Sequence, residues 1–232
     1  MRFSVWIGLL LLLAGSGGCC TPFGSASRPN VVVLRGIIGY WPFIEPFESS
    51  LCAEGICPTT AFAEGYHQVA DEIVEGQQSG RWQGPLVIVG YSSGANSAIK
   101  LCRDLGGRGV KVDKLVLLET SYDDLVPANV RSCVNIYKSQ PATDWIPIFR
   151  GIPLCAESAQ TELVNRDIHY EPYAHGFLNH HLTICANPAV QQLMLDEVRE
   201  GIDGGGGSSG SCGFPRGCRP CPPANAPCGP CR

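Results

Sequence analysis

A serine flanked by two glycines is the residue of this sequence best placed to do chemistry. Ser92 lies in GYSSG, residues 90–94, between a continuous apolar run and a stretch with helical spacing of apolar residues. A serine at a sharp strand-to-helix turn needs small neighbours, because larger side chains would clash with the helix or the adjacent strand. The following helix N-terminus favours negative charge nearby. The pattern predicts a nucleophile at Ser92; an ordinary turn serine is the alternative.

This strand–turn–helix setting resembles the nucleophile elbow of the α/β-hydrolase superfamily. The stretch GYSSGA is similar to the elbow of cutinases and related small serine esterases. The succession NVVVLRGIIGYWPF, GYSSGA, LVLLET, VPANV, VNIYKS and NHHLTI is similar to short bacterial hydrolases of lipase or thioesterase type. The resemblance covers residues 31–198. It implies a small sheet without a large cap domain, and the chain order serine, acid, histidine.

The resemblance also implies which residues act as base and acid. The family's histidine lies in the loop before the closing helix, where His181 matches best, with His180 and His175 as alternatives. A histidine there can take the serine proton near neutral pH.

The acid is expected at the end of a strand after the elbow helix. Glu119 ends the apolar run KLVLLE, and Asp123 and Asp144 remain as alternatives. Such a carboxylate orients the imidazole and stabilises its charged form.

The oxyanion hole is expected from backbone N–H groups. One is that of Ser93, which directly follows the nucleophile. The resemblance places the other in the loop RGIIGYW after the first strand, with Gly36 and Ile37 as the candidates.

Strand-like and helix-like runs alternate along the chain. Strands are predicted over residues 30–36, 85–90, 112–120, 133–139 and 161–171, and helices over residues 63–80, 93–107 and 187–202. This alternation predicts an α/β fold: a parallel sheet of about five core strands, covered by helices on both faces as a three-layer sandwich.

The two ends of the chain differ from the body. Residues 1–19 have the pattern of a signal peptide, followed by a linker over 20–30; Cys19 is a candidate lipidation site, with plain cleavage as the alternative. The hydrolase domain is expected over 31–203, followed by a Gly/Ser linker (204–211) and a Cys/Pro-rich tail (212–232). The protein is therefore expected to be exported, as a cell-envelope lipoprotein or a periplasmic or extracellular protein.

Composition agrees with export. The chain has 13 cysteines in 232 residues, a usage typical of oxidising compartments. The six body cysteines could form three bridges, and one between Cys155 and Cys185 would brace the histidine loop. The net charge of −4 and the lack of a basic patch argue against a nucleic-acid partner.

The sequence therefore predicts a secreted or lipid-anchored serine hydrolase that cleaves small acyl esters or thioesters through an acyl-enzyme. No cofactor or metal is expected. The alternative is a non-catalytic surface protein with a hydrolase fold, in which the cysteine-rich tail binds a partner.

Overall fold

A computed structural model describes residues 30–140, 144–146, 149–176 and 179–204. The predicted signal peptide with Cys19, the linker up to residue 29, and the segment from residue 205 to the end of the tail lie outside the described residues. Among the helices that are described, none combines the length and the apolar character that a membrane crossing requires.

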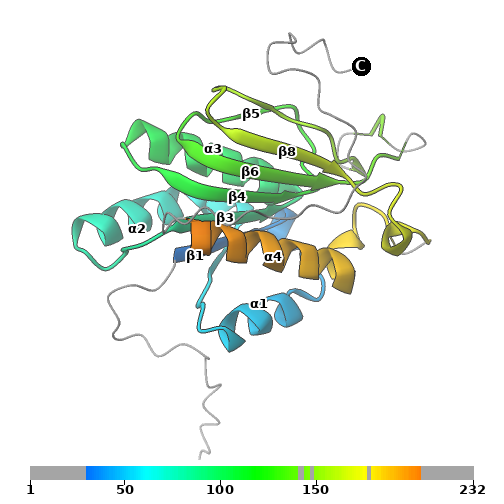
Figure 1. Cartoon of the computed structure of the whole chain (residues 1–232), viewed down its shortest axis with the longest axis horizontal. Helices are drawn as coiled ribbons and strands as arrows, with labels where there is room; N and C mark the ends of the chain where they lie inside the picture. The colour runs from blue at the N-terminus through cyan, green and yellow to red at the C-terminus, as the bar shows by residue number, and fades with distance from the viewer. Residues whose placement is uncertain (1–29, 141–143, 147–148, 177–178, 205–232) are drawn as a thin grey trace, which may run out of the picture.

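A six-stranded parallel sheet forms the centre of the described domain (Figure 1). Its strands, in spatial order, are β2 (Thr59–Phe62), β1 (Asn30–Arg35), β3 (Leu86–Tyr91), β4 (Val112–Leu118), β6 (Val130–Tyr137) and β8 (Glu162–Asp167). A separate pair is formed by β5 (Leu125–Val126) and β7 (Cys155–Ala156).

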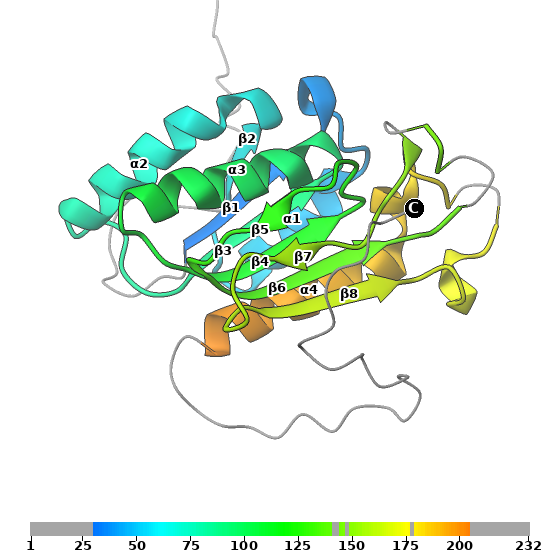
Figure 2. The same ribbon diagram turned by 90° about the horizontal axis from the view of Figure 1, so that it is seen from above.

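Helices cover both faces of the sheet. Figure 2 shows α2 (Tyr66–Gln78) and α3 (Ser93–Gly107) along one face and α4 (Pro188–Gly204) on the other. Helix α1 (Ile44–Ala53) packs with α4. Short 3-10 turns over Ile37–Gly39, Ala63–Gly65, Pro172–Ala174 and Ile184–Ala186 lie in the connections.

Strand alternation divides the apolar side chains between two cores. In β1, Val31 and Val33 belong to the core shared with α1 and α4, whereas Val32 and Leu34 belong to the core shared with α2 and α3. Successive side chains of a strand point to opposite faces. The predicted α/β three-layer sandwich is confirmed, with the difference that the short strand β2 makes the main sheet six-stranded instead of five-stranded.

The parallel register brings two candidate site residues side by side. Tyr91 pairs with Leu118, which in turn pairs with Ile136, so β3, β4 and β6 end at the same level. The backbone N–H of Ser92 donates to the carbonyl of Leu118, and that of Glu119 donates to the carbonyl of Ile136. The sheet hydrogen bonding therefore fixes where both residues leave their strands.

The cysteines correct part of the disulfide expectation. Cys57 is disulfide-bonded, but Cys102, Cys133 and Cys185 are buried thiols. The bridge between Cys155 and Cys185 is wrong, as are three bridges within the body. Cys185 is fully buried beside the Tyr91 hydroxyl, and its burial raises the pKa of the thiol to about 12.

The two glycines around Ser92 are required by close backbone contacts. A Cβ atom on Gly90 would lie 2.6 Å from the Gly94 carbonyl oxygen, and one on Gly94 would overlap the carbonyl oxygens of Leu34 and Arg35. These contacts let the N-terminus of α3 approach the ends of β1 and β3.

We predict that Gly94→Ala lowers the free energy of unfolding by about 1–3 kcal/mol, because the added methyl group overpacks a rigid backbone contact. Gly107→Ala is the matched control in the same helix, since a Cβ there meets nothing within 4 Å. The control should be neutral or stabilise by up to about 1 kcal/mol. Urea unfolding measures both, and equal effects of the two substitutions would contradict the steric argument.

Candidate active site

Three side chains form a continuous chain of hydrogen bonds at the carboxyl edge of the sheet. Ser92 Oγ lies 2.8 Å from His181 Nε2, and His181 Nδ1 lies 2.9 Å from Glu119 Oε2. Glu119 is fully buried, His181 is 2% exposed and Ser92 is half-buried. Only the serine end of this chain is thus open to a ligand.

The partners of the imidazole fix its tautomer. A carboxylate can only accept, so His181 Nδ1 carries a proton that it donates to Glu119. In the neutral ring Nε2 is then an acceptor, and it receives the hydroxyl hydrogen of Ser92. This is the arrangement in which a histidine can remove the serine proton.

Backbone strain is concentrated around these residues. Among the described residues, the non-glycine residues with positive φ are Ser92 (φ 56°), Glu119 (φ 58°), Ile38 (φ 52°) and Phe43 (φ 57°). Ser92 and Glu119 directly follow β3 and β4, whereas Ile38 and Phe43 lie in the connection after β1. Such conformations cost about 1–3 kcal/mol each and persist only where the surrounding structure enforces them.

The second oxygen of Glu119 is held by the neighbouring strand end. The backbone N–H of Lys138 donates to Glu119 Oε1 at 2.7 Å, which leaves Oε2 for His181. Gly151 packs against this carboxyl group: a Cβ atom there would lie 2.9 Å from Glu119 Oε1. The carboxylate is therefore fixed on both sides.

Two tyrosine hydroxyls hold the segment that carries the histidine. Tyr91, directly before the nucleophile, donates to the carbonyl of His181 at 2.6 Å, and its ring stacks near the imidazole with centroids 6.1 Å apart. Tyr40, from the loop after β1, donates to the carbonyl of Leu182 at 2.8 Å. Burial raises the pKa of the Tyr91 phenol far above its ordinary value, so this hydroxyl stays protonated and remains a donor.

The expected oxyanion donors differ in availability. The Gly36 N–H donates to the Tyr40 carbonyl at 3.0 Å and closes a turn, so Gly36 is not available as a donor in this structure. The N–H groups of Ile37 and Ser93 have no hydrogen-bond partner among the described residues, and each begins a helical turn. The arrangement favours these two as the pair.

The alternative bases lie away from the serine–carboxylate pair. His180 accepts the Leu182 N–H through Nδ1, and His175 is exposed.

The alternative acids likewise make no described contact with a histidine. Asp123 is exposed, whereas Asp144 accepts the backbone N–H of Gln140.

Several large apolar side chains of the loop after β1 and of the histidine loop are exposed: Ile37, Ile38, Tyr40, Phe43 and Leu182. The two loops are joined by the hydrogen bond from the Tyr40 hydroxyl to the Leu182 carbonyl. Trp41, from the loop after β1, is instead buried against Phe47 and Tyr91.

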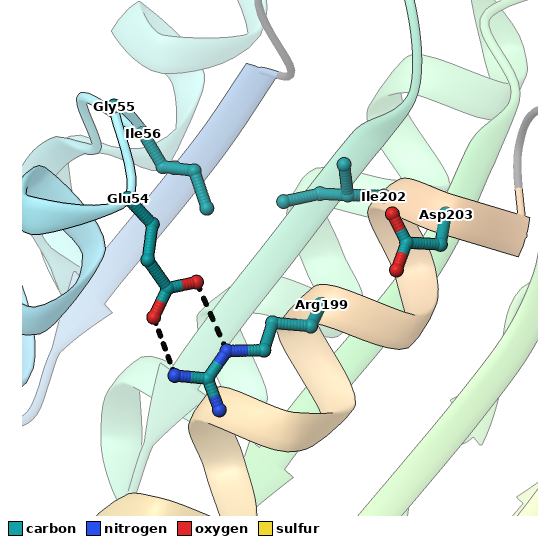
Figure 3. A pocket seen from close by; sticks show the side chains of 6 residues that line it. All are labelled: Glu54, Gly55, Ile56, Arg199, Ile202 and Asp203. Carbon is teal, nitrogen blue, oxygen red and sulfur yellow. Dashed lines mark hydrogen bonds and ion pairs between the residues drawn. The ribbon is translucent and has the colours of Figure 1, made fainter.

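A separate hollow lies at the opposite edge of the sheet. It is formed between the ends of α1 and α4, where Arg199 and Glu54 form an ion pair (Figure 3). Gly201, two residues after Arg199 in α4, packs against Lys114 near the start of β4, whereas the serine lies beyond the end of β3. The hollow thus takes no part in the site. No cluster of metal-ligating side chains occurs within the described part of the chain.

Three residues at the site are not marked by any pattern in the sequence. Tyr91, Lys138 and Gly151 act through contacts with residues 19 to 90 positions away. The motif GYSSG contains Tyr91 but does not reveal where its hydroxyl points.

Comparisons with known proteins found three partial similarities. Residues 54–130 match the model of the thioesterase domain family, a segment that includes Ser92 and Glu119 but not His181. A 91-residue stretch is 35% identical to the non-reducing polyketide synthase Dhc5 of Alternaria cinerariae; the match covers 36% of this chain and only 4% of the synthase. Among solved structures, the type II thioesterase BorB of the borrelidin biosynthetic cluster matches with a TM-score of 0.38 and 10% identity, covering 74% of this chain and 93% of BorB.

We predict that Tyr91→Phe lowers the free energy of unfolding by about 1–3 kcal/mol, because the buried His181 carbonyl loses its donor. Tyr170→Phe is the control, since the Tyr170 side chain is 83% exposed and should tolerate the change. Chemical denaturation of both variants checks this. A Tyr91→Phe variant as stable as the control would show that the hydroxyl contributes nothing to holding the loop.

Proposed function

We propose that this chain, whose fold and comparisons support a place in the α/β-hydrolase superfamily, hydrolyses acyl thioesters or esters with Ser92 as nucleophile. The match of residues 54–130 to the thioesterase domain family supports this reaction class. The observation that carries the proposal is the hydrogen-bond chain from Ser92 through His181 to Glu119, buried at its acid end and open at its serine end.

The proposed reaction proceeds in two halves. His181 Nε2 takes the hydroxyl proton as Ser92 Oγ attacks the acyl carbonyl, and Glu119 stabilises the imidazolium that forms. The N–H groups of Ile37 and Ser93 bind the oxyanion. His181 then gives its proton to the leaving thiol or alcohol, and water repeats the sequence to release the acid and restore the serine.

Exposed apolar side chains in two loops of the site support an acyl substrate. Ile37 and Ile38 lie in the loop proposed to supply an oxyanion donor, and Leu182 directly follows His181, so we propose that they contact the hydrocarbon part of the acyl group. Between thioesters and carboxylic esters, the family match favours thioesters.

Export and lipid anchoring are further proposals. They rest on the sequence of residues 1–19 and on Cys19, which lie outside the described residues. They place the proposed hydrolase in the cell envelope or outside the cell.

A non-catalytic role is the competing proposal. In that role the Cys/Pro-rich tail (212–232) would bind a partner, and Ser92 would have no function. The buried carboxylate and the strained backbone at Ser92 favour the enzyme, because a binding scaffold has no need of either.

We predict that a fluorophosphonate probe labels the purified protein on Ser92. Ser92→Ala should abolish labelling and reduce hydrolysis of acyl thioesters and p-nitrophenyl esters by a factor on the order of 10⁴ or more. Ser79→Ala, an exposed serine at the end of α2, is the control and should label as the wild type does. Labelling of the Ser92→Ala variant, or a lack of labelling of the wild type, would contradict the proposal that the protein is an enzyme.

We predict that Glu119→Gln lowers kcat by about 10²- to 10⁴-fold, because the amide cannot stabilise the imidazolium and can impose the wrong tautomer. Asp123→Asn is the matched control, since this exposed carboxylate follows the same strand. Steady-state kinetics on one acyl thioester compare the two variants. A large loss in Asp123→Asn with near-normal Glu119→Gln would reassign the acid.

A further inference from the structure

Lys138 contacts both the proposed catalytic carboxylate and the segment that leads to the proposed catalytic histidine. The residue directly follows β6, and its backbone N–H donates to Glu119 Oε1 at 2.7 Å. Its side chain turns to the histidine loop, where Nζ donates to the carbonyls of Ala174 and Asn179, each at 2.7 Å. One residue thus links the carboxylate to the segment that leads into His181.

The ammonium group of Lys138 lies in an environment that is unusual for a charged group. Its side chain is buried, at 9% exposure, and no carboxylate forms an ion pair with it among the described residues. Burying an ammonium group without a counter-ion is unfavourable, and its hydrogen bonds to carbonyls offset this cost only in part. An apolar residue of similar length would avoid this cost, so stability alone does not account for the lysine.

Lys114 provides the contrast within the same sheet. It is also buried, at 4% exposure, but its ammonium group pairs with Glu197 at 2.8 Å and Glu200 at 3.4 Å on α4. It lies near the start of β4, at the opposite end of the sheet from Ser92. Lys114 therefore forms a structural ion pair between strand and helix, whereas the described partners of the Lys138 ammonium group are backbone carbonyls of the histidine loop.

We propose that Lys138 is a positioning residue that sets the distance between Glu119 and His181. This inference rests on the proposed function of the site. The backbone N–H holds Oε1, so that Oε2 faces the imidazole. The ammonium group draws the segment at Ala174 and Asn179 toward the end of β6.

Substitution of the two lysines tests the proposal. Lys138→Met should lower kcat for an acyl thioester by about 10- to 100-fold, the loss expected from misplacing a catalytic group by about an ångström, and should leave KM within about threefold. Lys138→Arg keeps the charge and should recover part of kcat. Lys114→Met should lower stability but retain the wild-type kcat. Lys138→Met with wild-type kcat, or Lys114→Met with an equal kcat loss, would overturn the proposal.

A double-mutant cycle separates positioning from a general structural effect. In the Glu119→Gln background, Lys138→Met should cost less than threefold further in kcat, because the contact it serves is already lost. A full additional loss there would show that Lys138 acts independently of Glu119. If Lys138→Met does not fold, Lys138→Arg and Lys138→Gln replace it, and wild-type kcat in both overturns the assignment.

Fluorophosphonate labelling distinguishes the two levels of failure. A wild type that is not labelled removes the proposed function and this inference together. A wild type that is labelled on Ser92, with Lys138→Met labelled at the same rate, removes only the role of Lys138.

Discussion

The two hydrogen bonds of the His181 ring are the contacts on which the rest of the site depends. They join residues 89 and 62 positions apart in the chain, so no local preference can form them. The parallel register of β3, β4 and β6 places Ser92 and Glu119 beside one another. The histidine, which follows the last strand at a distance, must be brought back to them by contacts with its loop.

Those contacts come from three different strand ends. Tyr40 follows β1, Tyr91 ends β3 and Lys138 follows β6, and each donates to a backbone carbonyl of the segment from 174 to 182. Every residue has a backbone carbonyl, so these hydrogen bonds do not depend on which side chains the accepting residues carry. The strained backbone at Ser92 and Glu119 is held by the packed core on both faces of the sheet.

The sequence predicted the elements whose pattern is local. Strands β1, β3, β4, β6 and β8 and helices α2, α3 and α4 have apolar runs or helical spacing that survive without tertiary context. Strand β2 was missed because Thr59–Phe62 is short and only half-buried. Helix α1 was missed because it follows Phe43 in a left-handed conformation and contains a proline in its first turn.

The same distinction holds within the site. Ser92 is marked by its neighbouring glycines, whereas Glu119 and His181 were chosen among alternatives only through a family resemblance, because their partners are distant in sequence. The engagement of the Gly36 N–H depends on where the Tyr40 carbonyl turns, which no residue pattern reveals. The thiol state of Cys185 likewise depends on its burial beside Tyr91.

Two ionisable groups near His181, the Cys185 thiol and the Tyr91 phenol, are neutral, which leaves few charges close to the imidazole. Burial raises the pKa of the Cys185 thiol to about 12 and that of Tyr91 well above its ordinary value, so both stay uncharged at neutral pH. The charged groups bound to this assembly are then the Glu119 carboxylate and, through the loop, the Lys138 ammonium. In a poorly solvated site each charge acts over a longer range than in water. Glu119 is the charged group bound directly to the imidazole, and the Lys138 N–H and the close packing of Gly151 hold its other oxygen.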